Sequence, residues 1–237
     1  IAYTDDNNSN YGKAIVGTVS GTSISFGTAA VFETSNSQLL NAVYDSVNQK
    51  VIIIYMDGGD SDKGKAVIGT VSGTSVSFGS AITFSSVAVS NLSAAYSAAS
   101  SSVIASYRIA PQAYGTVISG VTSASNISFG SALTFTTDAT QWTASVYDSN
   151  AAKYVIAYMN DDTSDRGEAV VYTDVSSNNT SFIGITDAAI ANTASGSITI
   201  KGGIATLTGA TYAVTVANPG SGNRYYIDGI LQQTLNL

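Results

Sequence analysis

The stretch Gly17-Thr-Val-Ser-Gly-Thr-Ser-Ile-Ser-Phe-Gly27 returns with a single substitution as Gly69-Thr-Val-Ser-Gly-Thr-Ser-Val-Ser-Phe-Gly79. A looser copy follows as Gly120-Val-Thr-Ser-Ala-Ser-Asn-Ile-Ser-Phe-Gly130. The copies begin at residues 17, 69 and 120, so the period is 51 or 52 residues. A fixed period of this length is typical of tandem supersecondary units, and it therefore decides the architecture of this part of the chain.

The best-preserved copy contains short runs rich in Val, Ile, Thr, Tyr and Phe, bounded by Gly, Asn, Asp and Ser. This composition is typical of strands separated by turns. An acidic loop, 57–64, separates the second run from the third. We expect four strands per repeat, which in this copy lie at 39–44, 50–55, 65–71 and 75–78, the last continuing through 81–84.

Residues of one kind recur at equivalent places in successive repeats. We expect these columns to form the core and the contacts between repeats, because a repeat unit buries its apolar faces against its neighbours. The alignment also indicates that the chain begins at the second strand of a repeat. The columns are the first-run tyrosines Tyr44, Tyr96 and Tyr147; the second-run tyrosines Tyr3, Tyr55, Tyr107 and Tyr158; the loop-closing glycines Gly12, Gly64, Gly115 and Gly167; and the fourth-run aromatics Phe26, Phe78, Phe129 and Phe182.

Four antiparallel strands per unit of about 40–50 residues is the pattern of a β-propeller blade. The apolar run 51–54 fits an inner strand that is covered on both faces. We therefore predict an all-β chain in which residues 1–183 form a propeller-like array of four-stranded antiparallel units. The alternative is a stack of β-hairpin repeats along a fibre, which would bury the same columns.

The register of the repeat changes after Phe182. Residues 184–195 read as a linker with a helical turn near Asp187, and β-type runs follow at 197–200, 204–207 and 211–216. Asp228-Gly229 lies between two further runs and predicts a hairpin, because Gly accepts a positive φ. We predict a linker and a small, incomplete C-terminal β module over 184–237. We also expect the sequence to be an internal piece of a longer polypeptide, since it begins with Ile1 and ends abruptly.

The composition argues against several classes of function. The 237 residues include no histidine and no cysteine, which excludes imidazole catalysis, thiolate chemistry and disulfides. A net charge of −7 with nine scattered Lys and Arg residues argues against a nucleic-acid partner. The longest apolar runs, such as 51–56, are too short to cross a bilayer, so we expect no membrane insertion.

The amino-acid sequence of the repeat resembles tandem units in virion and tail-fibre-like proteins of marine bacteriophages, especially cyanophages. The matching residues are 17–32, Val43-Tyr-Asp-Ser46 and Ile54-Tyr-Met-Asp57, and the C-terminal Tyr225-Tyr-Ile-Asp-Gly-Ile230 is similar to a module that follows such repeats. These motifs are structural, so no catalytic residue is carried over. The acidic loop is lost at 108–113, which departs from the pattern.

The resemblance implies a non-enzymatic structural protein of the virion, as part of a tail fibre, an appendage or a capsid decoration. Its expected location is the extracellular particle. Its expected partners are other virion proteins and further copies of itself, in a homo-oligomer, and it could also recognise glycans of the host surface. The alternative function is a secreted or surface glycan-binding β-propeller of a bacterium. A third is a propeller glycosidase whose catalytic residues lie outside this sequence.

The acidic loops are the most suggestive candidates for a site. Asp5-Asp-Asn-Asn8, Asp57-Gly-Gly-Asp-Ser-Asp62 and Asn160-Asp-Asp-Thr-Ser-Asp165 occupy the same place in three repeats. Closely spaced Asp and Asn oxygens suit Ca²⁺, but EF-hand spacing is missing and the same residues are usual in hairpin loops. We predict solvated turns and no metal ligand, with calcium as the alternative.

Aromatic and acidic side chains offer two further candidates. The tyrosine columns and the lone Trp142 could form a sugar-stacking platform, although their regular recurrence favours packing. Paired carboxylates could hydrolyse glycosides, but Glu33 and Glu168 are the only glutamates and no sialidase-type Asp-box is present. We predict no enzyme activity, no catalytic or cofactor-binding residue, and no cofactor.

Overall fold

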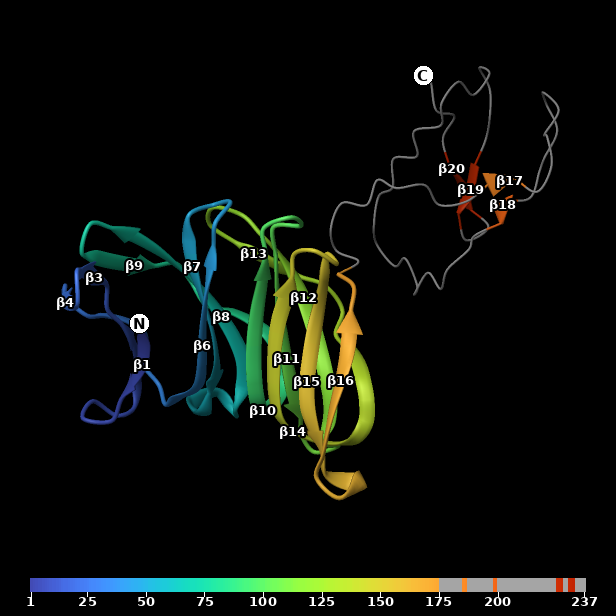
Figure 1. Cartoon of the computed structure of the whole chain (residues 1–237), viewed down its shortest axis with the longest axis horizontal. Helices are drawn as coiled ribbons and strands as arrows, with labels where there is room; N and C mark the ends of the chain where they lie inside the picture. The colour runs from blue at the N-terminus through green and yellow to red at the C-terminus, as the bar shows by residue number, and fades with distance from the viewer. Residues whose placement is uncertain (175–184, 187–197, 200–224, 228–229, 233–237) are drawn as a thin grey trace, which may run out of the picture. The chain divides into compact units, whose positions relative to one another are not determined.

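The computed structural model describes residues 1–174 and four short strands at 185–186, 198–199, 225–227 and 230–232 (Figure 1). The chain divides into two compact units, Ile1–Ser177 and Asn178–Leu237. The domain boundary predicted between 183 and 184 lies outside the described residues and stays a prediction. The described structure is all-β and antiparallel, as predicted. Its helical residues form two short 3-10 turns, and no described helix has the length and hydrophobicity needed to cross a membrane.

The first unit contains four successive sheets, which are numbered here in chain order. The first sheet consists of β1 (Ala2–Asp5), β2 (Tyr11–Ala14) and β5 (Ala30–Glu33), with the hairpin β3 (Gly17–Ser20) and β4 (Ser23–Phe26) beside it. The second sheet consists of β6 (Ser37–Asp45), β7 (Lys50–Asp57), β8 (Lys63–Ser72), β9 (Ser75–Phe78) and the start of β10 (Ile82–Ser97).

The third and fourth sheets repeat this order. The third sheet contains the end of β10, β11 (Ser102–Ile109), β12 (Tyr114–Thr122), β13 (Ile127–Phe129) and the start of β14 (Leu133–Asp148). The fourth sheet contains the end of β14, β15 (Lys153–Asn160) and β16 (Arg166–Tyr172). The strand positions match the sequence prediction, including β9 at 75–78, and β1 is a second strand, as expected.

Two long strands are each shared by neighbouring sheets. Residues Ile82–Ala88 of β10 pair with β8, whereas Val89–Ser97 pair with β11. Because β14 does the same, β6 to β16 form one hydrogen-bonded set of 11 strands. The sequence predicted a separate fourth strand and next first strand. In the structure the strand instead changes partners without ending, and no Gly or Pro interrupts the chain from 82 to 97.

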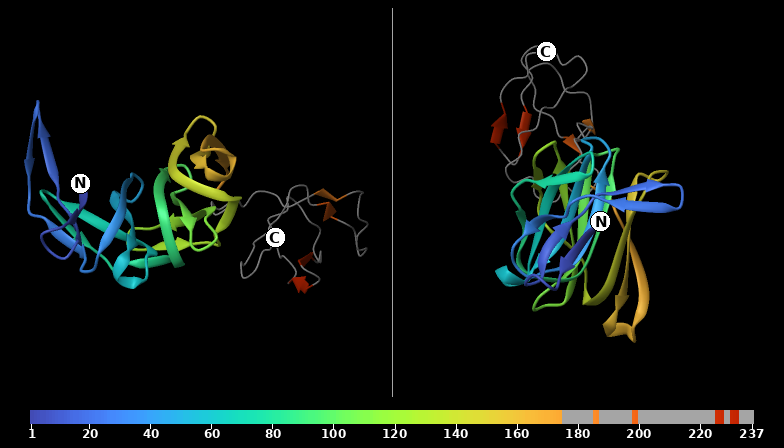
Figure 2. Two further views of the ribbon diagram at one scale, coloured as in Figure 1. Left: turned by 90° about the horizontal axis from the view of Figure 1, so that it is seen from below. Right: turned by 90° about the vertical axis from the view of Figure 1, so that its left-hand side faces the viewer.

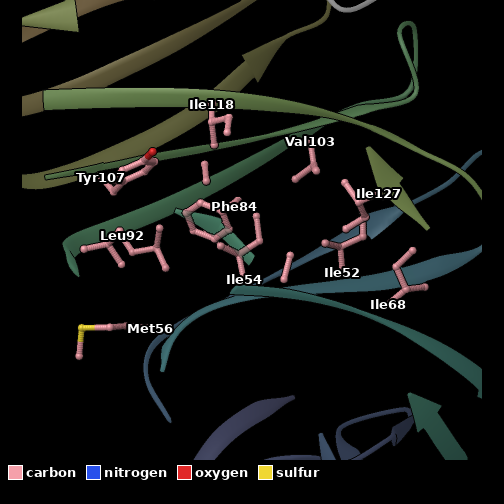
Figure 3. Packing of buried hydrophobic residues seen from close by; sticks show 13 residues of the cluster. Ile52, Ile54, Met56, Ile68, Phe84, Leu92, Val103, Tyr107, Ile118 and Ile127 are labelled. Atoms are coloured by element: carbon pink, nitrogen blue, oxygen red, sulfur yellow. The ribbon is translucent and has the colours of Figure 1, made fainter. Parts of the chain in front are cut away.

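The sheets stack face to face, and the colours in Figure 2 run from blue to orange in the order of the sheets. Ile53, Tyr55 and Val67 of the second sheet pack with Ala14 of the first. The opposite face of the second sheet packs on the third in the largest cluster, which Figure 3 displays around Phe84. Ala95, Ile104 and Val117 of the third sheet then pack with Tyr154 and Ile156 of the fourth.

The first strands of neighbouring sheets are also joined by hydrogen bonds. Asn41 Nδ2 donates to Leu92 O at 2.9 Å, between β6 and β10. Ser145 N donates to Ser93 Oγ at 2.9 Å, between β14 and β10. The sheets are therefore held together along their first strands as well as through their apolar faces. Within the part of the chain that the structure describes, they do not close into a ring or barrel.

A glycine and two aromatic rings fit together at each stacking contact. A Cβ atom on Gly64 would lie 2.3 Å from Cε2 of Phe84, so only glycine leaves room for this ring. The Phe84 ring in turn lies 5.5 Å from that of Tyr107 in the next sheet. The same arrangement recurs in Gly12, Phe32 and Tyr55, and in Gly115, Phe135 and Tyr158.

The fourth-run aromatics are less buried than the sequence predicted. The side chain of Phe26 is 55% exposed, and Phe78 and Phe129 are half-buried. Phe182 lies outside the described residues. Phe84 is only 8% exposed, so the second half of the fourth strand carries the main aromatic contact. The prediction was wrong for Phe26 because it lies on the short β3–β4 hairpin, which pairs with no other strand.

Thr116 allows a test of an unsatisfied hydroxyl. Thr116 is 3% exposed and its Oγ1 has no hydrogen-bond partner, whereas the buried Thr140 donates its Oγ1 proton to Asp138 O at 3.2 Å. We expect Thr116→Val to leave the free energy of unfolding unchanged or to raise it by up to about 1 kcal/mol, because valine removes a desolvated hydroxyl. Thr140→Val should lower it by about 1 kcal/mol. Urea unfolding measures both; equal losses in the two variants would contradict the expectation.

The second unit contains two short strand pairs. Ile185–Thr186 (β17) pairs with Ile198–Thr199 (β18), although the sequence placed 185–186 in a linker. Tyr225–Ile227 (β19) pairs with Ile230–Gln232 (β20), which confirms the hairpin predicted around Asp228-Gly229. The strands predicted at 204–207 and 211–216, and the helical turn near Asp187, lie outside the described residues.

Candidate functional site

The acidic loops form tight turns between the second and third strands. Asp57 precedes the 3-10 turn η1 (Gly58–Asp60), and its Oδ1 accepts a hydrogen bond from Gly59 N at 2.9 Å. Asn160 precedes η2 (Asp161–Thr163), and its Oδ1 accepts a hydrogen bond from Asp162 N at 3.1 Å. The first acidic or amide side chain of each loop therefore caps the turn, which is the usual role of Asp and Asn at such positions.

Asp57 is buried at the centre of a polar cluster. Its carboxylate is 3% exposed, accepts a hydrogen bond from Ser35 Oγ, and lies 2.6 Å from Lys65 Nζ. Lys65 Nζ also lies 3.1 Å from Asp60 Oδ2, so one ammonium group bridges two carboxylates. The prediction of a solvated turn is therefore wrong for Asp57, which is buried and paired with Lys65.

The cluster changes the acidity of its members. Burial alone would raise the pKa of Asp57, but hydrogen bonds from Lys65 and Ser35, and the Lys65 charge, outweigh it and lower the pKa below its ordinary value. Burial likewise opposes the charged form of Lys65, yet its bonds to Asp57 and Asp60 raise the pKa of the ammonium group. Both groups are therefore held in their charged forms.

The same pairing appears in the first sheet and changes in the later ones. Lys13 Nζ lies 2.5 Å from Asp5 Oδ2, at the places equivalent to Lys65 and Asp57. In the fourth sheet the equivalent residues are Asn160 and Glu168, so the carboxylate and the lysine are lost together. This joint change indicates that the acidic position serves the local fold.

The calcium alternative finds little support in these loops. Across residues 1–174 and the short strands beyond them, no three acidic side chains are arranged to hold a metal ion. In the second sheet, the oxygens of Asp57 and Asp60 already surround the Lys65 ammonium group. The assignment of no metal ligand stays a prediction.

Three of the four second-run tyrosines lie between the sheets, as their recurrence indicated, whereas Tyr3 is half-buried in the first sheet. Tyr55, Tyr107 and Tyr158 are 0%, 2% and 9% exposed, which confirms them as packing residues, although Tyr158 also borders the groove described below. Burial raises the pKa of Tyr107 to about 12. Two of these tyrosine hydroxyls donate hydrogen bonds to carboxylates. Tyr55 donates to Glu33 and Tyr158 donates to Glu168, each at 2.9 Å.

The two glutamates considered for catalysis therefore serve different sheets. Glu33 ends β5 in the first sheet, and Glu168 lies in β16 of the fourth. Each accepts a hydrogen bond from a tyrosine, and Glu168 but not Glu33 lines the groove beside Trp142. This arrangement gives no support to a glycosidase pair among the described residues, and the absence of catalysis stays a prediction.

A second polar cluster lies at the other end of the sheets. Asp45 is fully buried and its carboxylate accepts hydrogen bonds from Val47 N, Asn48 N, Asn48 Nδ2 and Tyr96 OH. Burial and the bond to Asp45 raise the pKa of Tyr96 to about 12. Because Tyr96 belongs to the third sheet, this cluster joins two sheets and also serves the fold.

Among the described residues, the outer face of the fourth sheet combines exposed apolar side chains with a groove. Trp142, Val146 and Val171 on this face are 71%, 61% and 62% exposed. An open groove of about 600 Å³ runs beside Trp142 and is lined further by Ala157, Tyr158, Met159, Asp165, Gly167, Glu168 and Ala169. We take this apolar face, formed by β14, β15 and β16, as the candidate functional site.

The backbone directs Trp142 outward. Trp142 has a φ of 50°, in the left-handed region that L residues rarely adopt, and it lies where the β14–β15 register shifts. Leu39 and Asn91, at the equivalent bulges of β6 and β10, share this conformation with φ values of 53° and 49°. The bulge is thus a feature of the three first strands that the structure describes, and the fourth sheet places an indole on it.

The sequence interpretation missed this face because it treated Trp142 as a packing residue. The alignment of the repeats could have indicated an apolar face here. Val155 and Val171 occupy the places of Ile52 and Ile68 in the second sheet. Those isoleucines are buried only because another sheet covers them, and the fourth sheet has no such cover among the described strands. No protein-family model, curated protein or solved structure matches the chain.

Proposed function

We propose that the chain is a non-enzymatic structural component of a phage virion, in a tail fibre, an appendage or a capsid decoration. Its buried polar side chains support this role, because they are used in contacts that hold the sheets. Asp57 binds Lys65 within the second sheet, and Asp45 binds Tyr96 across two sheets. Sheets that are held together in this way form a rigid body. Such a body suits display and contact with other virion proteins.

We further propose that the sheets form a propeller-like array. Two observations support this geometry over a simple fibre of hairpins. The outer, fourth strand of one sheet runs on as the first strand of the next, as in β10, and the first strands are joined by Asn41 and Ser145. Successive blades of a propeller are likewise four-stranded and stack around a common axis.

The observation that carries the functional proposal is the continuous stacking of repeats through matched faces. The test is to purify phage particles that encode this chain and to locate it by mass spectrometry and labelled electron microscopy. We expect it on the particle in a fixed copy number. Its absence from purified particles, together with secretion from host cells, would contradict the proposal.

The alternative of a secreted or surface glycan-binding module rests on Trp142, whose exposed indole borders a groove containing Asp165. Sugars commonly bind through apolar stacking combined with a few polar groups. A glycan array and the fluorescence of Trp142 distinguish the two functions. Saturable, sugar-dependent fluorescence shifts that Trp142→Ala abolishes, in a protein absent from particles, would favour the alternative.

A further inference from the structure

Two contacts between neighbouring sheets carry different side chains at equivalent positions. We call the contact of the second sheet with the third the isoleucine joint, and that of the third sheet with the fourth the serine joint. At the isoleucine joint, Ile54 of β7 and Ala94 of β10 belong to one apolar cluster (Figure 3). Strand pairing gives the places of Ile54 and Ala94 to Ser106 and Ser145 at the serine joint. One position thus changes from apolar to hydroxyl on both sides of the contact.

The two serines bond to each other across the serine joint. Ser106 is fully buried, and its Oγ lies 2.6 Å from the Oγ of Ser145. The backbone of Ser145 is also fixed, because its N donates to Ser93 Oγ at 2.9 Å. A buried hydroxyl that loses its partner destabilises a fold, whereas a bonded pair is tolerated. The pair is therefore satisfied only while the third and fourth sheets face each other.

A second contact at the serine joint also depends on the third sheet. Tyr154 OH lies 3.0 Å from Ser102 Oγ, and both residues are buried. The place of Ser102 is held in the second sheet by Lys50, whose Nζ donates to Thr70 Oγ1 at 2.9 Å. The second sheet thus has a longer, charged side chain where the fourth sheet brings a tyrosine.

Sheets with equivalent strands could stack out of order, and misassembly of this kind is a characteristic failure of repeat proteins. In this chain, an out-of-order stack would place the fourth sheet on the second and leave the third sheet out. Ser145 would then face Ile54 instead of Ser106, and its hydroxyl would lose its partner. The correct order satisfies the hydroxyl, whereas the out-of-order stack does not.

We propose that the contact between Ser106 and Ser145 selects the fourth sheet as the neighbour of the third and keeps the sheets in chain order. The selection depends on the difference between the two joints, because identical joints would accept each other's sheets. This role goes beyond the proposed structural function, since a stack of repeats needs a defined order whatever the array binds.

The test follows refolding of the full chain from urea by pulsed hydrogen exchange and mass spectrometry. A chain with its fourth sheet on the second leaves β11 and β12 unprotected while β7, β8, β15 and β16 are protected. Ser145→Ala should raise the fraction of such chains at least about tenfold, because it leaves Ser106 unpaired in the correct order. The new alanine would also fit Ile54, as Ala94 does. Ser149→Ala, in the exposed turn after β14, is the matched control and should refold as the wild type does.

A double variant, Ser106→Ile with Ser145→Ala, keeps the test valid if the single variant is too unstable to refold. It gives the serine joint the pair of the isoleucine joint, so it should recover the stability that either single change removes in urea unfolding. It should still form more out-of-order chains than the wild type and fewer than Ser145→Ala, because its two joints are alike at this position.

Three results would overturn the proposed selection. The first is a Ser145→Ala chain that refolds in the correct order as completely as the wild type. The second is a Ser149→Ala chain that forms as many out-of-order stacks as Ser145→Ala, which would indicate a general loss of stability. The third is a double variant whose loss of stability equals the sum of the two single losses, because the hydroxyls would then act independently.

Discussion

Replacing Phe84 by alanine is expected to lower the free energy of unfolding by about 3–5 kcal/mol, the usual loss for a buried phenylalanine. Phe84 is 8% exposed, and its ring lies 5.5 Å from those of Tyr107 and Phe129 in the third sheet. It also covers Gly64, which has no side chain to fill the space left by the ring. The cavity would thus open at the contact between two sheets (Figure 3).

Urea unfolding followed by circular dichroism measures the loss, and Phe26→Ala is the matched control. Phe26 lies on the β3–β4 hairpin of the preceding repeat and is 55% exposed, so we expect a loss below about 1 kcal/mol. Equal losses for the two variants would mean that stacking between the second and third sheets does not carry the stability of the fold.

Replacing Asp57 by alanine is the second large effect, with an expected loss of about 2–4 kcal/mol. The change leaves Lys65, the Ser35 hydroxyl and Gly59 N without their buried acceptor, and breaking a buried pair from one side is costly. The loss should fall at the lower end because Lys65 retains Asp60 at 3.1 Å. Asp6→Ala, at an exposed residue of the equivalent loop, should stay within about 0.5 kcal/mol.

The pH dependence of stability identifies the charge of Asp57 as the cause. Its pKa is lowered in the folded state, and the unfolded value is about 3.9. The stabilisation is therefore complete above the unfolded pKa and is lost as the pH falls through the folded pKa. Asp57→Asn keeps a side chain that can cap the turn, as Asn160 does, but should flatten this acid limb. An acid limb identical to that of the wild type would contradict the role of the charge.

The strands and the second-run tyrosines could be predicted from the sequence because both depend on local pattern and recurrence. Val51-Ile-Ile-Ile54 is apolar at every position, and the structure covers β7 on both faces. Tyr55 recurs at Tyr107 and Tyr158 because each packs on a phenylalanine of the preceding sheet. Recurrence of this kind reports packing, which every repeat needs.

The remaining features depend on neighbours that local sequence does not specify. Asp57 looks like any loop aspartate, and its burial follows from Ser35 in the β5–β6 connection and Lys65 in β8. Val171 is exposed because no described sheet packs beside the fourth sheet, whereas the equivalent Ile68 is covered by the third. The sequence repeat therefore predicted the strands of each sheet. Which sheet faces are covered depends on the position of each sheet in the stack.

The strand β10, which belongs to two sheets, limits how the chain can change in length. Inserting or deleting one residue within Ile82–Ser97 would turn the apolar side of one sheet outward, because side chains alternate along a strand. Turns have no such restriction. From Tyr107 to Gly115 there is one residue fewer than from Tyr55 to Gly64, and the difference falls in a turn. Duplication in whole periods is thus compatible with this fold, whereas gradual change in repeat length is confined to the loops.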